Sequence, residues 1–332
     1  MEKNFTAGEI LDLAMAYWGS CALQAGVQID LFSALAAGPR SEQELAARLG
    51  CDGRAFNMLV SALASMGFLH REGDKVIASG DSIKFLARSS PEYVGFIILH
   101  HAHIMPAWSR LAQAVRSGQA SAERLVITTS DEEEREAFLL GMFNIAQQQA
   151  GSIAQALDLS GRSRLLDIGG GPGTYAVHFC RRNPELRAAV IDLPASEPIA
   201  RKIVTASGLA DRIDFVGGDY FSMPLPQGDV VWLSQVIHGE NPEQAALLIK
   251  KAAACLPSGG LLGVQEFVLN DDRGGPQHPA LFSLAMLVET ASGQAYTQRE
   301  IKTMMQAAGV KSPRRLEVDL PQGCQVLVGE MA

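Results

Sequence analysis

The stretch LLDIGGGPGTY, residues 165–175, decides the fold of the second half of this chain. Its first residues form an apolar run typical of a buried strand, and glycines follow at positions 169, 170, 171 and 173. In an open α/β sheet, ligands bind at the carboxyl ends of the strands, and glycine lets a ligand approach the backbone closely. The spacing G-x-G-x-G, with Pro172 inside it, is neither the G-x-G-x-x-G of dinucleotide sites nor a P-loop. We therefore expect a nucleotide-like ligand whose binding does not require a cradled pyrophosphate.

Acidic residues stand at the ends of three successive apolar runs. Asp167 precedes the glycines, where it would repel a phosphate but attract an ammonium group. Asp192 ends the run AAVID, at the place where a carboxylate binds ribose hydroxyls. Asp219, in GGDYF, is placed to bind an adenine amino group, with Tyr220 or Phe221 packed on the ring. Together the carboxylates predict S-adenosyl-L-methionine (SAM) as the ligand, with S-adenosyl-L-homocysteine (SAH) as its product.

From about residue 160 the pattern of the sequence changes. Short apolar runs alternate with helical segments, in the order RLLDIG, LRAAVID, IDFVGGDY, DVVWLSQVI and LLGVQEFVL. Such alternation indicates a parallel sheet with helices on both faces. We therefore expect an α/β protein with a Rossmann-like C-terminal domain, residues 156–332, and a mainly helical N-terminal domain, residues 1–155.

The N-terminal half has the order helix, turn, helix and small β wing that is typical of a winged helix. Apolar spacing predicts a helix over residues 10–35, and Ser41 with Glu44 forms a capping-box pattern. Two short strands are expected within residues 68–79. The second helix carries only Arg54 as a positive side chain, whereas a DNA reader needs several. The apolar first helix favours dimerisation instead, so we expect a homodimer and no nucleic acid as partner.

Composition excludes several classes of protein. The chain has 332 residues and a formal net charge of −8, which argues against a broad basic surface for nucleic acid. Its five cysteines form no CxxC pair, as is usual for reduced thiols. Residues 1–19 show no signal-peptide pattern, and no apolar stretch is long enough to cross a bilayer. We therefore expect a cytoplasmic protein that does not bind membranes.

With these motifs in view, the whole chain resembles the class I SAM-dependent methyltransferases of the plant-type small-molecule O-methyltransferase group. This group includes acetylserotonin methyltransferases and bacterial natural-product enzymes. The motifs DIGGGPGTY, VIDLP, GGDYF and VIHGENPEQ carry the resemblance. It implies a homodimer with interlocked N-terminal helices and a cleft for a small-molecule methyl acceptor. The cofactor residues expected from the motifs and the resemblance are Asp167, Gly169, Gly171, Gly173, Asp192, Leu193, Gly218, Asp219, Tyr220, Phe221 and Ser234.

The expected catalytic residue is His238, which follows the fourth strand. A phenol is a poor nucleophile until it is deprotonated, and an imidazole is a suitable base at neutral pH. The resemblance implies a catalytic histidine here, usually in His-Asp-Trp, whereas this chain has His238-Gly239-Glu240. It also implies two glutamates that orient the imidazole. Glu266 matches the first of them.

Two further positions depart from the pattern of the group. Ala295 occupies the place of the second glutamate, with Glu289 a few residues upstream, and Ser234 stands where a lysine is often found. These departures leave open a methyl transfer to carbon, nitrogen or sulfur that relies on positioning without a base. Two remoter alternatives are a winged-helix protein that senses a small ligand and a nicotinamide oxidoreductase. The weakly basic second helix argues against the first, and the glycine spacing argues against the second.

The acceptor pocket is expected to be apolar, which implies a flat or lipophilic acceptor by analogy with the group. No metal is expected, because the spacing of His100, His101 and His103 does not bring three ligands to one helix face. The residues expected to line the pocket are His101, Met142, Phe143, Phe282, Met286 and Glu289.

Overall fold

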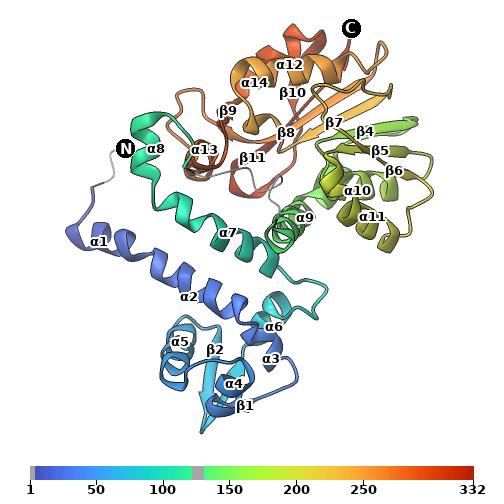
Figure 1. Ribbon diagram of the computed structural model, residues 1–332. Coiled ribbons are helices and arrows are strands. Elements are labelled where there is room, and N and C mark those ends of the chain that lie inside the picture. The colour runs from blue at the N-terminus through green and yellow to red at the C-terminus, as the bar shows by residue number, and fades with distance from the viewer. Residues whose placement is uncertain (1–3, 122–130) are drawn as a thin grey trace. The chain divides into compact units, whose positions relative to one another are not determined.

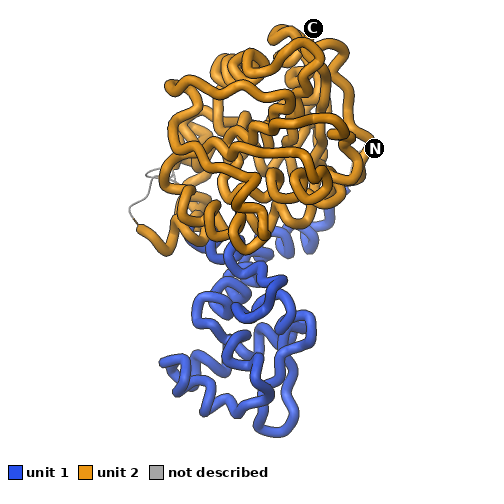
Figure 2. The backbone as a smooth tube through the Cα atoms, turned by 90° about the vertical axis from the view of Figure 1, so that its right-hand side faces the viewer, with its two compact units in different colours: residues 1–103 blue, residues 104–332 orange. Residues whose placement is uncertain are grey.

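The computed structural model describes residues 4–121 and 131–332 of the chain (Figure 1). The backbone divides into two compact units, residues 1–103 and residues 104–332, which are coloured separately in Figure 2. The sequence-based domain boundary, after residue 155, coincides with the last turn of helix α9 (Glu132–Ala156) in the second unit.

The first unit contains short helices and a small antiparallel sheet of order β1-β3-β2. Its strands are β1 (Arg40–Ser41), β2 (Leu69–Glu72) and β3 (Lys75–Ala78). Its helices are α1 (Ala7–Met15), α2 (Tyr17–Gln28), α3 (Leu31–Leu35), α4 (Glu42–Arg48), α5 (Gly53–Ser65) and α6 (Gly80–Leu86), and α7 (Gly95–Trp108) begins in it. The winged-helix order expected from the sequence is therefore present.

Two local predictions for this unit have different outcomes. The capping box is confirmed, because the Glu44 amide donates to the Ser41 hydroxyl and the Ser41 amide donates to the Glu44 carboxylate. The single helix over residues 10–35 is wrong, because the segment forms three helices. Asp30, with φ of 58°, lies in the left-handed region that interrupts a right-handed helix, so α2 ends before it and α3 begins after it.

The second unit is built on one large sheet. Its strands are β4 (Arg164–Ile168), β5 (Arg187–Asp192), β6 (Ile213–Gly217), β7 (Val230–Ser234), β8 (Leu261–Leu269), β9 (Tyr296–Thr297), β10 (Val310–Arg315) and β11 (Cys324–Met331). Besides α9, its helices are α8 (Leu111–Ser117), α10 (Thr174–Arg182), α11 (Glu197–Ala206), α12 (Pro242–Ala253), α13 (Gln277–Glu289) and α14 (Gln298–Ala307). Single 3₁₀ turns are η2 (Pro194–Ser196), η3 (Ile237–Gly239) and η4 (Pro321–Gly323).

The strand order is β10-β11-β8-β7-β4-β5-β6, with β9 paired to β8. The run from β8 to β6 is parallel, as the alternating pattern predicts. The sequence analysis identified no strand after β8, and the two strands at that edge of the sheet are antiparallel: β11 pairs with β8, and β10 pairs with β11. The α/β class with a Rossmann-like second half is confirmed.

Helices cover both faces of this sheet, α9, α10 and α11 on one and α12 and α14 on the other (Figure 1). Strand residues alternate between the two apolar cores. Val230 and Trp232 of β7 join the first core, and Val231 and Leu233 join the second. Because β4, β5, β6 and β7 are parallel, their carboxyl ends lie at the same end of the sheet, and the candidate site is there. No helix in the described part of the chain is long and apolar enough to cross a bilayer.

Candidate functional site

The glycine-rich loop leaves β4 in a conformation that excludes side chains. Gly169, Gly171 and Gly173 have φ of 69°, 48° and 75°, a region that L side chains rarely adopt. A Cβ on Gly169 would also lie 2.6 Å from Cγ2 of Val236, so the β4 and β7 loops touch here. Helix α10 begins directly after Gly173. The loop therefore offers bare backbone at the edge of the sheet.

Asp167 lies beneath this loop and is fully buried. Its Oδ2 accepts the Ala176 amide at 3.3 Å, and its Oδ1 has no hydrogen-bond partner in the described part of the chain. A Cβ on Gly170 would come within 2.6 Å of the Asp167 carboxyl carbon, so the loop backbone covers the carboxyl closely. Burial raises the pKa of Asp167 to about 7. A cation above the loop would favour the charged form of this carboxyl.

Asp192, the last residue of β5, ties the second strand end to the glycine loop. Its Oδ2 accepts the Gly171 amide at 2.7 Å, and its Oδ1 accepts the Leu193 amide at 2.7 Å and the Ser196 hydroxyl at 2.9 Å. Burial raises the pKa of Asp192, and these three donors oppose that effect. A carboxylate offers about four lone-pair sites, so Oδ2 retains one for a ligand hydroxyl.

The loop after β6 carries Asp219, Tyr220 and Phe221. It starts beside the second strand end, because the Gly218 amide donates to the Asp192 carbonyl at 2.9 Å. Asp219 is exposed, and its carboxylate accepts the Phe221 amide at 2.9 Å. The rings of Tyr220 and Phe221 lie 5.0 Å apart between centroids. Burial raises the pKa of Tyr220, and the nearby carboxylates, Asp192 among them, raise it further. The second and third acidic motifs are thus neighbours.

The Ser234 hydroxyl belongs to a buried polar network. It donates to Oε1 of Gln265 at 2.9 Å, and Nε2 of Gln265 lies 2.9 Å from Oε1 of Gln149 and 3.3 Å from Sγ of Cys324. The next residue, Gln235, has φ of 56°, an uncommon conformation at the end of β7. The sequence analysis missed Gln265 and Gln149, which have no motif around them and meet only through the fold.

His238 and Glu266 form a buried pair. Nδ1 of His238 lies 2.7 Å from Oε2 of Glu266, whose side chain is 2% exposed. Oε1 of the same carboxylate accepts the amides of Val236 at 3.0 Å and His238 at 3.3 Å. This arrangement places the imidazole proton on Nδ1, which leaves Nε2 with a free lone pair in the neutral ring. No group in the described residues hydrogen-bonds to Nε2, and the histidine side chain is 15% exposed.

An aromatic cluster lies beside the imidazole and contacts it through Phe282. Phe282 of α13 packs edge-to-face on the His238 ring, with centroids 4.8 Å apart. Phe267, the residue after Glu266, lies 4.7 Å from both the Phe282 ring and the His278 ring. His278, like Phe267, was not among the residues expected from the sequence. One face of the imidazole is therefore covered by an apolar ring.

Helix α13 presents Phe282, Met286 and Glu289 at positions i, i+4 and i+7, which is one helical face. Burial raises the pKa of Glu289 to about 7, and the charge of His238 opposes that effect. This interaction places Glu289 near the imidazole. Among the residues that the structure describes, none hydrogen-bonds to its carboxyl group. The face therefore combines an apolar wall with one carboxyl.

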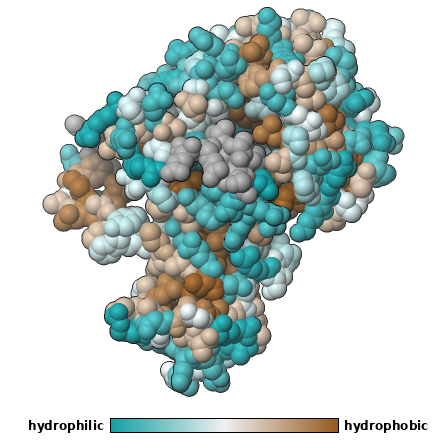
Figure 3. All heavy atoms as spheres, viewed as in Figure 1, coloured by the Kyte–Doolittle hydropathy of each residue, from teal (hydrophilic) through white to brown (hydrophobic). Residues whose placement is uncertain are grey.

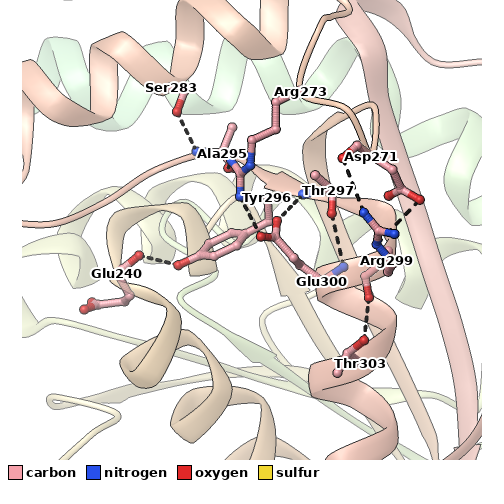
Figure 4. Close-up of polar contacts among 10 residues, drawn as sticks. All are labelled: Glu240, Asp271, Arg273, Ser283, Ala295, Tyr296, Thr297, Arg299, Glu300 and Thr303. Atoms are coloured by element: carbon pink, nitrogen blue, oxygen red, sulfur yellow. Dashed lines mark hydrogen bonds and ion pairs between the residues drawn. The ribbon is translucent and has the colours of Figure 1, made fainter.

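The segment around Ala295 contacts α13 and the loop that follows His238 (Figure 4). Ala295 is 1% exposed, and its amide donates to the Ser283 hydroxyl at 3.2 Å. The Tyr296 hydroxyl donates to the Glu240 carbonyl at 2.6 Å, and the Gln294 amide donates to the His238 carbonyl at 2.8 Å. This segment thus fixes the backbone of His238 and places no carboxylate at position 295.

The other residues expected in the pocket lie on α9 and α7. Met142 and Phe143 of α9 are half-buried in the second unit. His101 belongs to the first unit, where it is exposed, and burial lowers the pKa of its neighbour His100 to about 4. The described residues contain no group of three metal-ligating side chains.

Comparison with known proteins gives concordant results. Residues 108–311 match the family model of an O-methyltransferase domain, and residues 11–81 match that of an O-methyltransferase dimerisation domain. The chain is similar to the 3-hydroxy-5-methyl-1-naphthoate 3-O-methyltransferase of Streptomyces sahachiroi, with 32% identity over 97% of this chain and 95% of that one. It is also similar to the N,N-dimethyltransferase OxyT of Streptomyces rimosus, with 28% identity over 94% and 93%. The solved structure of PigF with SAH superposes with a TM-score of 0.90 at 26% identity, covering 98% of this chain and 100% of the other.

Proposed function

Since the chain belongs to the SAM-dependent O-methyltransferase family of small-molecule enzymes, we propose that it methylates a hydroxyl group of an aromatic or lipophilic metabolite with His238 as general base. The observation that carries this proposal is the 2.7 Å contact between Nδ1 of His238 and Glu266, which leaves Nε2 free to take a proton. The remaining groups of the site support it as follows.

The strand-end residues suit SAM. The unpartnered, buried oxygen of Asp167 lies under the glycine loop, where its charge attracts the amino group of the methionine moiety through space. Asp192 keeps a lone-pair site for a ribose hydroxyl, and the loop of Asp219, Tyr220 and Phe221 offers a polar group and rings to the adenine. When bound, SAM supplies an electrophilic methyl group, which leaves its sulfur as the acceptor oxygen forms a bond to it.

His238 and Glu266 divide the work of proton transfer. Nε2 of His238 accepts the proton of the acceptor hydroxyl, which makes the oxygen a stronger nucleophile. The ring then carries a positive charge, and the Glu266 carboxylate stabilises it at Nδ1. Glu266 is itself held by two backbone amides, so it keeps the ring in one orientation while the charge changes.

Helix α13 would hold the acceptor. Phe282 and Met286 offer an apolar face to a flat ring system, and Glu289 adds one group that binds a second polar substituent of the acceptor. Burial raises the pKa of this carboxyl to about 7, so it can donate or accept a hydrogen bond at neutral pH. The carboxyl would distinguish acceptors that carry two polar groups from those that carry one.

The test is a methyl-transfer assay with labelled SAM and matched acceptors. Because one relative acts on a hydroxynaphthoate, the panel contains hydroxynaphthoates and the aminonaphthoates of the same shape. Labelled methyl ethers from the hydroxy compounds alone would support the proposal. Labelled amines alone would contradict it.

Transfer to nitrogen is the second candidate, with carbon and sulfur as further acceptor atoms. The similarity to an N,N-dimethyltransferase and the departures at Gly239, Glu240 and Ala295 favour it. An amine that is already unprotonated needs no base, so the His238 contact would then serve positioning alone. The aminonaphthoate arm of the panel separates the two candidates.

We also infer that the enzyme is a homodimer, which rests on the dimerisation-domain match and on the surface of the first unit. Helix α1 has no buried residue, and Figure 3 shows apolar side chains gathered over it at the left of the view. An isolated helix with this face exposed to water would be unfavourable. The large apolar side chains exposed on α1 and α2 are Ile10, Leu11, Leu13, Met15, Tyr17 and Trp18.

A further inference from the structure

Lys251 of α12 makes an unusual set of contacts with the loop that follows β6. Its Nζ lies 2.6 Å from the Tyr220 carbonyl oxygen and 2.7 Å from the carbonyl oxygens of Phe221 and Met223. An ammonium group has three donors and no acceptor, so these contacts use its full hydrogen-bonding capacity. Lys251 forms no ion pair with any acidic residue in the described ranges. Its partners are backbone atoms of one loop.

This arrangement forces three carbonyl groups of one short loop to converge. Such carbonyls repel one another unless a cation lies between them, so Lys251 is what makes the turn favourable. The lysine itself is half-buried on a helix that is packed into the core through Leu248, Ile249 and Ala252. The loop is thus attached to a fixed element of the fold.

The other side of the loop is anchored independently. The Met223 amide donates to the Asp219 carbonyl at 2.9 Å, which closes the turn. A Cβ on Gly218 would lie 2.6 Å from Sδ of Met223, so the methionine side chain covers the start of the loop. Lys251 binds the carbonyl of this same Met223, so it holds the end of residues 218–223 while the Met223 side chain covers their start.

We propose that Lys251 is a positioning residue for SAM, because it holds residues 219–221 in the conformation that receives the adenine end of the cofactor. This inference rests on the proposed function, which assigns Asp219, Tyr220 and Phe221 to the adenine. Lys251 touches no reacting atom and acts through the loop. A loop that is already ordered loses little conformational freedom on binding. Removing Lys251 should therefore weaken the binding of the cofactor and leave the methyl-transfer step itself unchanged.

The experiment compares Lys251→Met with Lys250→Met. Lys250 is the exposed neighbour on the same helix, so both variants lose one positive charge and keep the same helix. SAH and adenosine are titrated into each protein by calorimetry, and amide hydrogen exchange is followed in residues 218–224 and in α12. We expect Lys251→Met to bind both ligands about tenfold more weakly than the wild type, and Lys250→Met to bind them as the wild type does.

Exchange separates positioning from a general loss of structure. In Lys251→Met the amides of Phe221 and Met223 should exchange faster while those of α12 keep their protection. Unchanged SAH affinity in a folded Lys251→Met protein would overturn the inference, as would equal loss of protection throughout the second unit. If the methionine variant does not fold, Lys251→Gln, which keeps two donors on a side chain one atom shorter, takes its place with an intermediate effect expected.

Asp219→Ala, measured in parallel, tests the adenine assignment itself. Unchanged SAH affinity in this variant would contradict the proposed cofactor site. Weaker binding in Asp219→Ala together with wild-type binding in Lys251→Met would contradict only the role of Lys251. Neither result depends on the acceptor or on His238, so failure of the hydroxyl-transfer proposal is measured separately.

Discussion

The Asp192 carboxylate accepts the Gly171 amide at 2.7 Å, so the acidic residue that ends β5 holds the glycine loop that follows β4. The two motifs are 21 residues apart in sequence and form one structural unit at the edge of the sheet. A carboxylate expected to bind the ribose therefore also sets the shape of the loop beside it. This double role governs how substitutions at Asp192 act.

Asp192→Ala should weaken SAH binding by about tenfold to a hundredfold, because a buried ribose hydroxyl and the Gly171 amide lose an acceptor together. Asp192→Asn should have a smaller effect, since an amide oxygen can still accept from Leu193 and Ser196. Calorimetry measures both, with Asp214→Ala, an exposed aspartate of β6, as the control. Equal affinity in Asp192→Ala and the control would refute the assignment of Asp192.

Gly169→Ala should abolish detectable SAH binding at concentrations that saturate the wild type. Its φ of 69° strains any side chain, and the added Cβ would also lie 2.6 Å from Val236. Gly161→Ala is the matched control, because Gly161 has φ of 74° and nothing within 4 Å of its Cβ position. Both variants should lose about 1 kcal/mol of stability from backbone strain. Gly169→Ala should lose more because of the clash with Val236, and only Gly169→Ala should lose affinity. Thermal melts and calorimetry on the same samples would separate the loss of stability from the loss of SAH affinity that the contact with Val236 causes.

Asp167 gives a pH-dependent stability with a definite sign. Burial raises its pKa from 3.8 to about 7 in the folded protein, so the folded state retains a proton that the unfolded state releases. Stability without cofactor should therefore fall as the pH rises from about 4 to about 7, by an amount on the order of a few kcal/mol. In Asp167→Asn this decrease should be smaller, and the part that remains comes from other carboxyls with raised pKa values, Glu289 among them. Denaturant unfolding at several pH values measures the difference between the two proteins, and parallel curves would contradict the buried carboxyl.

The sequence predicted the parts of this structure that depend on local pattern. Strand ends with Asp192 and Asp219 follow apolar runs, and Ser41 with Glu44 is a short-range cap, so each can be recognised from a few neighbouring residues. The antiparallel strands β10 and β11 were missed. Their direction depends on the strand with which each one pairs, and the local sequence pattern does not identify that partner. Lys251 and Gln265 carry no motif, and their partners lie 28 or more residues away. The break at Asp30 also has no signal of the kind that glycine or proline gives.

Dimerisation should depend on the apolar face of α1. Leu13 is 71% exposed in the single chain, so Leu13→Asp would be harmless in a monomer and would bury a charge in a dimer. We expect light scattering to give about twice 35.5 kDa for the wild type and about that mass for the variant. Val115→Asp, at a 60% exposed residue of α8, is the control and should remain dimeric. A monomeric wild type would overturn the inference.

His238→Ala decides whether a base is needed. If Nε2 takes the proton of a hydroxyl acceptor, the variant should lose about a hundredfold or more in single-turnover methyl transfer while SAH affinity stays nearly unchanged. Glu266→Gln should lose less, because the amide can still accept from Nδ1–H but stabilises the imidazolium more weakly. If the acceptor is an unprotonated amine or a thiolate, the alanine variant should stay within a few-fold of the wild type. Gly239, Glu240 and Ala295 make that outcome informative, since each departs from the pattern that accompanies the base in the family. Single-turnover rates of both variants with one hydroxyl and one amine acceptor therefore assign the chemistry.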